Sequence, residues 1–157
     1  MVGAPERHRR ILAEVAELYE WLDAQLRQDP DGAGRCEACG ACCDFPAYDH
    51  RLFVTPHELI YLAAKLRVPA LKPMRTGRCP YQQGRSCTVH EHRFAACRIF
   101  CCTGSSAFQS ELSEAVIKRL KAICERYSIP YHYQDLATAL DTFLRDSKRT
   151  LNHESRK

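Results

Sequence analysis

The sequence predicts a mainly α fold in which a small helical domain packs around an irregular cysteine-rich centre. Four stretches repeat apolar residues at the spacing of an α-helix. Nine of the ten cysteines lie between residues 36 and 102, where apolar residues show no regular period. A chain of 157 residues can bury a sizeable core, and no internal repeat is apparent. We therefore expect a single cysteine-cluster domain over residues 1–146.

The first helix is expected over residues 5–28. Pro5 supplies a start signal, and the Asp-Pro-Asp-Gly-Ala-Gly run at residues 29–34 supplies a stop. The apolar stripe is wide, which favours packing against the cysteine domain over dimerisation or docking of a partner. Its members are Ile11, Leu12, Val15, Leu18, Tyr19, Leu22 and Leu26.

The run Cys-Glu-Ala-Cys-Gly-Ala-Cys-Cys at residues 36–43 places four thiols within eight residues. Thiolate is the soft ligand that holds zinc and iron–sulfur clusters, and a Cys-x2-Cys spacing lets two sulfurs reach one metal. Gly40 suits such a loop because it tolerates positive φ and close approach of its amide to a sulfur. Cys42 and Cys43 are adjacent, so we expect one to ligate while the other serves a second site or the cluster surround.

A short extended segment over residues 51–54 is expected to lead into a second helix. Thr55-Pro56-His57-Glu58 has the capping-box pattern with proline in the first turn, so this helix should run over residues 56–67. Pro69 and Pro73 then end it.

Residues 79–89 resemble a small hairpin or knuckle. Gln83 and Gly84 would form its turn and bring Cys79 and Cys87 near each other. Both thiols would then be available to the metal that the first cysteine run begins to bind.

Two further helices are expected near residues 110–127 and 134–146, separated by a break at Ile129-Pro130. Cys124 falls on the apolar stripe of the first of these, so it is expected to be a buried thiol that packs like a small hydrophobe.

Residues 147–157 are expected to form a basic, disordered tail. Residues 145–157 contain five Lys or Arg and two acidic residues, Asp146 and Glu154. This segment therefore carries +3 of the formal net charge of +4. The tail has no aromatic side chain to stack on bases, so binding to nucleic acid is not expected.

The N-terminus lacks the apolar run of a secretory signal, and nowhere do 18 apolar residues occur together. We therefore expect a cytoplasmic protein with no membrane association. In a reducing compartment a dense cysteine pattern favours a metal site over a disulfide framework.

The motifs together resemble one family. They are Cys36-x2-Cys39-Gly40-x-Cys42-Cys43, Val54-Thr55-Pro56-x-Glu58-Leu59, Gly77-x-Cys79-Pro80-Tyr81, Cys87-x-Val89, and Arg93-x3-Cys97-Arg98-x-Phe100 followed by cysteine. Over residues 36–102 the sequence resembles the YkgJ-like CxxCxxCC cysteine-cluster family, described as zinc- or iron-chelating. It departs from the family pattern at His90 and at Arg93-Phe94, and the doublet Cys101-Cys102 leaves open which of the two matches the last family cysteine.

The resemblance implies a metal-binding domain, often an iron–sulfur one. A similar module occurs in flagellin lysine N-methylases, but this chain has no domain for a methylation cofactor, so that reaction does not carry over. The candidate ligands are Cys36, Cys39, Cys42, Cys43, Cys79, Cys87, Cys97, Cys101 and Cys102. Which of Cys42 and Cys43, and which of Cys101 and Cys102, ligate stays open.

This ligand set exceeds the four thiolates that one zinc ion or one cubane cluster needs. Ligand number and softness favour an iron–sulfur cluster, of the 4Fe-4S type, over Zn²⁺. His50, His90 and His92 lie near the cysteines and would be the imidazole ligands of a zinc site, although each is expected to be a surface or neighbouring residue. Arginines flank the cysteines and would offset the negative charge of a thiolate-bound cluster. They are Arg35, Arg78, Arg93 and Arg98. For Arg98 the alternative role is binding of an anionic substrate.

Two functions follow from this pattern. The first is an iron–sulfur protein for electron transfer, redox sensing or cluster handling, with a possible protein partner. The alternative is a zinc-stabilised interaction module without redox chemistry. The sequence has no Gly-rich nucleotide loop, and whether it is an enzyme stays open.

Overall fold

The computed structural model describes residues 3–66 and 71–154 and is mainly α, with little strand. The helices of this described part are α1 (Ala4–Gln28), α2 (Pro30–Ala33), α3 (Pro56–Lys65), α4 (Ala95–Ile99), α5 (Ser106–Arg126) and α6 (Leu136–Glu154). Single 3₁₀ turns are η1 (Ala41–Cys43), η2 (Pro46–Tyr48) and η3 (His90–His92). The strands are two residues long: β1 (Phe53–Val54), β2 (Gln82–Gln83), β3 (Ser86–Cys87) and β4 (Gln134–Asp135).

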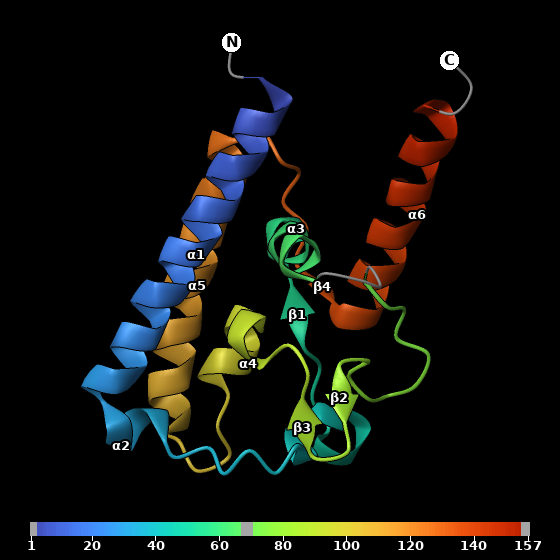
Figure 1. Cartoon of the computed structure of the whole chain (residues 1–157). Helices are drawn as coiled ribbons and strands as arrows, with labels where there is room; N and C mark the ends of the chain where they lie inside the picture. The colour runs from blue at the N-terminus through green and yellow to red at the C-terminus, as the bar shows by residue number, and fades with distance from the viewer. Residues whose placement is uncertain (1–2, 67–70, 155–157) are drawn as a thin grey trace.

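Helices α1 and α5 lie side by side along one flank of the molecule (Figure 1). They are antiparallel, because Glu14 near the start of α1 accepts hydrogen bonds from Arg126 and Tyr127 at the end of α5. Their facing stripes form one core cluster together with residues of α3 and α4. Its buried members are Val15, Leu18, Tyr19, Leu22, Tyr61, Ala95, Ile99, Leu112, Val116, Leu120 and Ile123.

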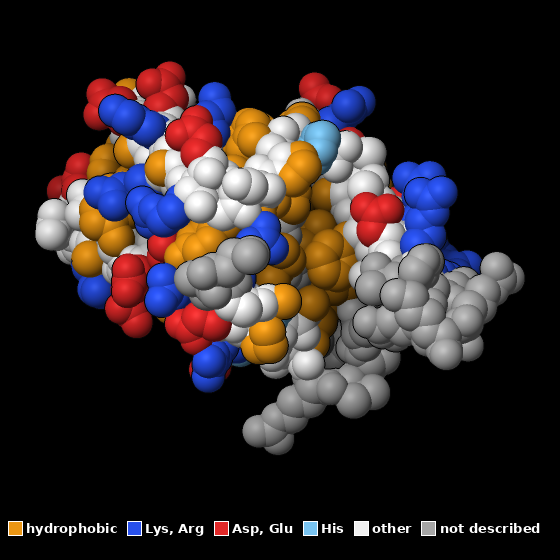
Figure 2. Space-filling model, turned by 90° about the horizontal axis from the view of Figure 1, so that it is seen from above, with side chains coloured by type: hydrophobic (Ala, Val, Ile, Leu, Met, Phe, Trp, Pro, Cys, Tyr) orange, Lys and Arg blue, Asp and Glu red, His pale blue; other side chains and the backbone are white. Residues whose placement is uncertain are grey.

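A second core cluster joins α3 and α6 to the cysteine-bearing loops. Figure 2 shows hydrophobic side chains gathered between the α1–α5 side and the α6 side when the molecule is seen from above. Cys79, Cys87 and Cys97 pack against this cluster. Its buried members are Phe45, Leu52, Val54, Leu59, Leu62, Leu71, Tyr81, Val89, Phe94, Leu136, Ala139 and Leu140.

The four short strands form two antiparallel ladders. β1 pairs with β4 in the register Phe53↔Asp135 and Val54↔Gln134, and the N–H of Leu136 extends this ladder to the carbonyl of Leu52. β2 pairs with β3 in the register Gln82↔Cys87, which makes the hairpin that residues 79–89 were expected to form. The β1–β4 ladder fixes the start of α6 beside the second core cluster.

Glu58 joins three helices from inside the core. The capping box at Thr55 is present, and both the N–H and the hydroxyl of Thr55 donate to Oε2 of Glu58, at 3.0 and 2.9 Å. Oε1 accepts from the backbone N–H of Ala95 on α4 at 2.9 Å and from the Tyr19 hydroxyl on α1 at 3.2 Å. Burial raises the pKa of this carboxyl even though these donors favour its charged form.

The four helices expected from apolar periodicity are confirmed as α1, α3, α5 and α6. Helix α3 ends earlier than expected, because Leu66 takes an extended conformation with ψ 129°. Pro69 lies outside the described residues, so its expected role in ending the helix is not tested. Helix α6 runs to Glu154, so residues 147–154, expected to be part of a disordered tail, are helical.

Candidate metal centre

The first cysteine loop lies against the segment that precedes the hairpin. The N–H of Cys79 donates to the carbonyl of Cys43 at 3.0 Å, and the N–H of Phe45 donates to the carbonyl of Gly77 at 3.3 Å. Between these two hydrogen bonds, Arg78 forms a 2.8 Å ion pair with Asp44. The backbone pairing therefore sets Cys43 beside Cys79.

Gly40 adopts the positive φ expected of it, 71°, and brings the first cysteine run against the hairpin. Its carbonyl accepts a 2.7 Å hydrogen bond from the side-chain amide of Gln82, opposite Cys87 in the β2–β3 ladder. A Cβ on residue 40 would lie 2.6 Å from that amide nitrogen. Gln82 was not singled out from the sequence, because a lone glutamine in a hairpin gives no signal of a long-range contact.

Cys43, Cys79, Cys87 and Cys97 interact electrostatically with one another. Burial raises the pKa of Cys97 well above its ordinary value, and the negative charges that Cys79, Cys43 and Cys87 could carry raise it further. Burial raises the pKa of Cys43 to about 12, and Cys79, Cys42 and Cys87 add to the effect. These thiols come from three separate segments of the chain.

Cys42 links this group electrostatically to the first two cysteines of the loop, Cys36 and Cys39. Burial raises its pKa, and Cys36 and Cys39 contribute to the shift. Both of those residues are exposed, and the N–H of Ala38 donates to Sγ of Cys36 at 3.4 Å. The amide that approaches a sulfur in this loop is thus that of Ala38, whereas the sequence had suggested Gly40.

Cys101 and Cys102 follow α4 and lie beside the start of the first cysteine loop. The hydroxyl of Thr103 donates to the carbonyl of Arg35 at 3.2 Å and accepts from its N–H at 3.0 Å. Sγ of Cys101 is buried, 3.3 Å from the Thr103 hydroxyl, whereas Cys102 is exposed. This geometry brings the pair close to the backbone of Arg35, next to Cys36.

Close glycine packing holds this second junction together. Gly34 has φ 77°, and a Cβ there would lie 2.5 Å from the backbone nitrogen of Gly104. The neighbouring carbonyl of Gly32 accepts a 2.8 Å hydrogen bond from the N–H of Ser105. The loop that carries Cys36 is therefore fixed at its start by the end of the α4–α5 connection.

Each candidate histidine already has a neighbour. Nε2 of His50 lies 3.1 Å from the carbonyl oxygen of Cys42, and its ring stacks on Phe100 at 5.1 Å between centroids. Nε2 of His90 lies 2.7 Å from the Arg93 guanidinium, whose charge, with burial, lowers the pKa of His90. His92 packs edge to face on Tyr61. His50 thus buttresses the cysteine loop through its backbone.

Arg98 is occupied by structural contacts. Its side chain, only 7% exposed, forms a 2.8 Å ion pair with Asp23 of α1 and lies over the ring of Tyr19. It also donates to the carbonyls of Arg93 and Glu91, at 3.0 and 2.8 Å. Arg93 is the arginine whose charge lowers the pKa of Cys97, which makes it the better candidate for offsetting thiolate charge.

Cys124 is buried on α5, as predicted, and its Sγ lies 3.3 Å from Nδ1 of the fully buried His57. Within residues 3–66 and 71–154, no three His, Cys, Asp or Glu side chains stand in an arrangement that could hold a metal ion as they are. In the same part of the chain, no helix is both long and apolar enough to cross a membrane.

One family model matches the sequence, over residues 35–125: CxxCxxCC, a putative zinc- or iron-chelating domain. The matched range begins just before Cys36 and ends just after Cys124, so it contains all ten cysteines. No curated protein and no solved structure matches the chain.

Proposed function

Because the chain belongs to the CxxCxxCC family, we propose that its cysteines hold an iron–sulfur cluster of the 4Fe-4S type. Electron transfer, redox sensing or cluster handling would be the use of such a cluster. The family description covers zinc and iron alike, so the choice of an iron–sulfur cluster rests on the donor set of this chain.

The observation that carries the proposal is the grouping of Cys43, Cys79, Cys87 and Cys97. Four soft donors from separate segments satisfy the ligand count of a cubane cluster, and Cys42 adds a fifth thiol in electrostatic contact with Cys43 and Cys79. A fifth thiol exceeds the four donors that a cubane cluster or one tetrahedral zinc ion needs, so the preference for iron–sulfur rests on the softness of an all-thiolate donor set.

The protein would position the cluster ligands, exclude water from the cluster and offset part of its negative charge. The Cys43–Cys79 backbone bond, the hairpin register and the Glu58 bond to α4 hold three of the ligand-bearing segments. Arg93 would offset part of the thiolate charge near Cys97. When bound, an iron–sulfur cluster supplies one-electron chemistry, with a potential set by such charges and by burial.

Binding requires deprotonation of these thiols. Because burial and mutual repulsion raise the pKa values of Cys43, Cys79 and Cys97, the neutral thiols are the stable form without a metal. Metal binding must therefore release protons, and apparent affinity should increase with pH. Among the described residues no three donors stand in a metal-binding arrangement, so binding must also move the sulfurs closer together.

Cys36, Cys39, Cys101 and Cys102 would form an outer group. The contact between Arg35 and Thr103 brings the segments that carry these cysteines together at the surface. We propose that the three exposed members, Cys36, Cys39 and Cys102, receive or release metal for the inner four, since exposed thiols exchange ligands more readily than buried ones.

Anaerobic purification followed by measurement of iron, acid-labile sulfide and zinc tests the proposal, together with the absorption spectrum. About four iron and four sulfide per chain with negligible zinc is the expected result for a 4Fe-4S cluster. Stoichiometric zinc without sulfide would replace the proposal with the zinc-stabilised interaction module.

A further inference from the structure

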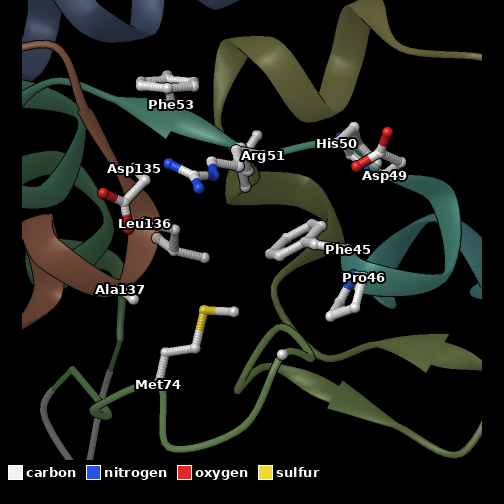
Figure 3. Close-up of a pocket in the computed structure, with 12 residues that line it drawn as sticks. Phe45, Pro46, Asp49, His50, Arg51, Phe53, Met74, Asp135, Leu136 and Ala137 are labelled. Atoms are coloured by element: carbon white, nitrogen blue, oxygen red, sulfur yellow. The ribbon is translucent and has the colours of Figure 1, made fainter.

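A cavity of about 510 Å³ lies beside the cysteine loops and is outside the metal centre (Figure 3). It opens between the β1–β4 ladder, the turn after Cys43 and the segment before Cys79. A cavity of this size suits a small organic molecule. None of the proposed metal ligands lines it.

The β1–β4 ladder and the residues beside it supply one wall of the cavity. Phe53 pairs with Asp135, and Arg51 precedes β1 by two residues. The lining residues from these two segments are Arg51, Leu52, Phe53, Asp135, Leu136 and Ala137. Arg51 and Asp135 are the charged members of this wall.

Arg51 and Asp135 bring opposite charges to the same end of the cavity (Figure 3). Among the described residues, Arg51 has no hydrogen bond or close ion pair; its charge acts on Asp135 only at a distance. Asp135 accepts from the N–H and the hydroxyl of Thr138, at 3.2 and 2.7 Å, which leaves other lone pairs of the carboxylate available. Burial opposes ionisation of Asp135, but these bonds and the Arg51 charge outweigh it and lower its pKa.

The rest of the cavity wall is mostly apolar. Phe45, Met74 and Leu136 reach into it from three different segments. Asp49 and His50 also line it, and His50 is held by its contacts with Cys42 and Phe100. A ligand that matches this cavity needs a positive group, a negative group and an apolar body.

We propose that this cavity binds a small zwitterion with an apolar side chain, that is, a free apolar α-amino acid. Its carboxylate would pair with the Arg51 guanidinium, a planar fork suited to carboxylates. Its ammonium group would pair with Asp135, and its side chain would lie among Phe45, Met74 and Leu136. A ligand with one charge could pair directly with only one of Arg51 and Asp135. The proposal does not depend on which metal the cysteines hold.

Three compounds with the same phenyl body test the charge requirement. Calorimetry on the metal-loaded protein would compare L-phenylalanine, 3-phenylpropionate, which lacks the ammonium group, and 2-phenylethylamine, which lacks the carboxylate. We expect L-phenylalanine to bind about tenfold or more tightly than either. Equal binding of all three, or no binding of L-phenylalanine at millimolar concentration, would overturn the proposal.

Methyl-labelled methionine locates the binding site. The chain has two methionines, Met1 and Met74, so the Met74 signal can be assigned with a Met74→Leu variant. L-phenylalanine should shift the Met74 methyl signal and leave that of Met1 in place. Binding without a shift of Met74 would show that the ligand binds elsewhere.

Variants test the contributions of Arg51 and Asp135 to binding one at a time. Arg51→Gln should weaken L-phenylalanine about tenfold and leave 2-phenylethylamine unchanged, and Asp135→Asn should weaken L-phenylalanine while leaving 3-phenylpropionate no weaker. Arg75→Gln, an exposed arginine outside the cavity, is the matched control and should change nothing. Far-UV circular dichroism checks that each variant folds. Unchanged affinity in folded Arg51→Gln would contradict the assignment.

Discussion

The backbone N–H of Cys79 donates a 3.0 Å hydrogen bond to the carbonyl oxygen of Cys43, and this bond joins two cysteine loops that lack a regular apolar stripe. The loops contribute single buried side chains, such as Phe45 and Tyr81, to the second core cluster, whereas α1 and α5 have a continuous apolar interface. The stability of the loops should therefore depend on bound metal, which can contribute on the order of 10 kcal/mol in small domains.

Removal of metal should increase amide exchange over residues 36–54 and 71–92 first. The amides of α1 and α5 should keep their protection, because their packing does not involve the cysteines. Helix α4 should also stay protected, since Ala95 is bonded to Glu58. Hydrogen exchange on metal-loaded and chelator-treated protein measures this by segment. Equal protection of the cysteine loops after full metal removal would show that metal does not order them.

Single cysteine substitutions should distinguish the thiols that bind metal from those that do not. Cys79→Ala removes an inner donor and should lower metal content per chain strongly, with affinity reduced by about two orders of magnitude or more. Cys124→Ala is the matched control, because Cys124 is buried against His57 and should leave metal content unchanged. Metal analysis of anaerobically purified variants gives the comparison. Normal metal content in Cys79→Ala would remove Cys79 from the ligand set.

Replacement of Glu58 should destabilise the helical frame. Glu58→Ala leaves the buried donors of Thr55, Ala95 and Tyr19 without their acceptor, at a cost of about 3 kcal/mol or more. Urea unfolding followed by circular dichroism measures the loss. Glu111→Ala, on the exposed face of α5, should change stability by less than about 0.5 kcal/mol. A Glu58→Ala loss no larger than that of this control would contradict the role given to the carboxyl.

Acid should destabilise the protein through His57. Burial lowers the pKa of His57 from 6.5 to about 4, so below pH 6.5 the unfolded chain takes up a proton that the folded chain does not. The free energy of unfolding should thus fall as pH decreases from 6.5 to about 4, by about 3 kcal/mol from this group, and then level off.

The comparison with His57→Gln isolates this effect. Glu58 acts in the opposite direction, because its raised pKa makes the folded state take up a proton first as pH falls. The difference in stability between wild type and His57→Gln cancels the Glu58 contribution and should shrink with decreasing pH. His132→Gln, an exposed histidine, is the control. A difference that stays constant over this range would show that His57 titrates normally.

The long helices could be predicted because periodicity over many residues reports the buried face directly. Helix α4 could not, since Ala95–Ile99 is too short to show a period and its first N–H is satisfied by Glu58, far away in the sequence. The capping box predicted the bond from Glu58 to Thr55, which is local, and gave no signal for the bonds to Tyr19 and Ala95.

The cysteine pattern predicted which thiols to consider and left their grouping open. Spacing along the chain cannot show that Cys97 lies with Cys43 and Cys79, because that depends on how α4 docks. Strand β4 was also missed, since two residues carry no alternation, and with it the approach of Arg51 to Asp135. Local sequence patterns do not predict short elements whose contacts are with residues far away in the sequence.

The carboxyl of Glu58 also sets an order of events during synthesis at the ribosome. Tyr19 and Thr55 are made before Glu58, but Ala95 is made 37 residues after it, so Oε1 lacks its backbone donor until that stretch has emerged. Docking of α4 supplies this donor and carries Cys97 toward Cys43 and Cys79 in the same movement. A nascent chain that stops short of Ala95 therefore has an incomplete core and also lacks Cys97.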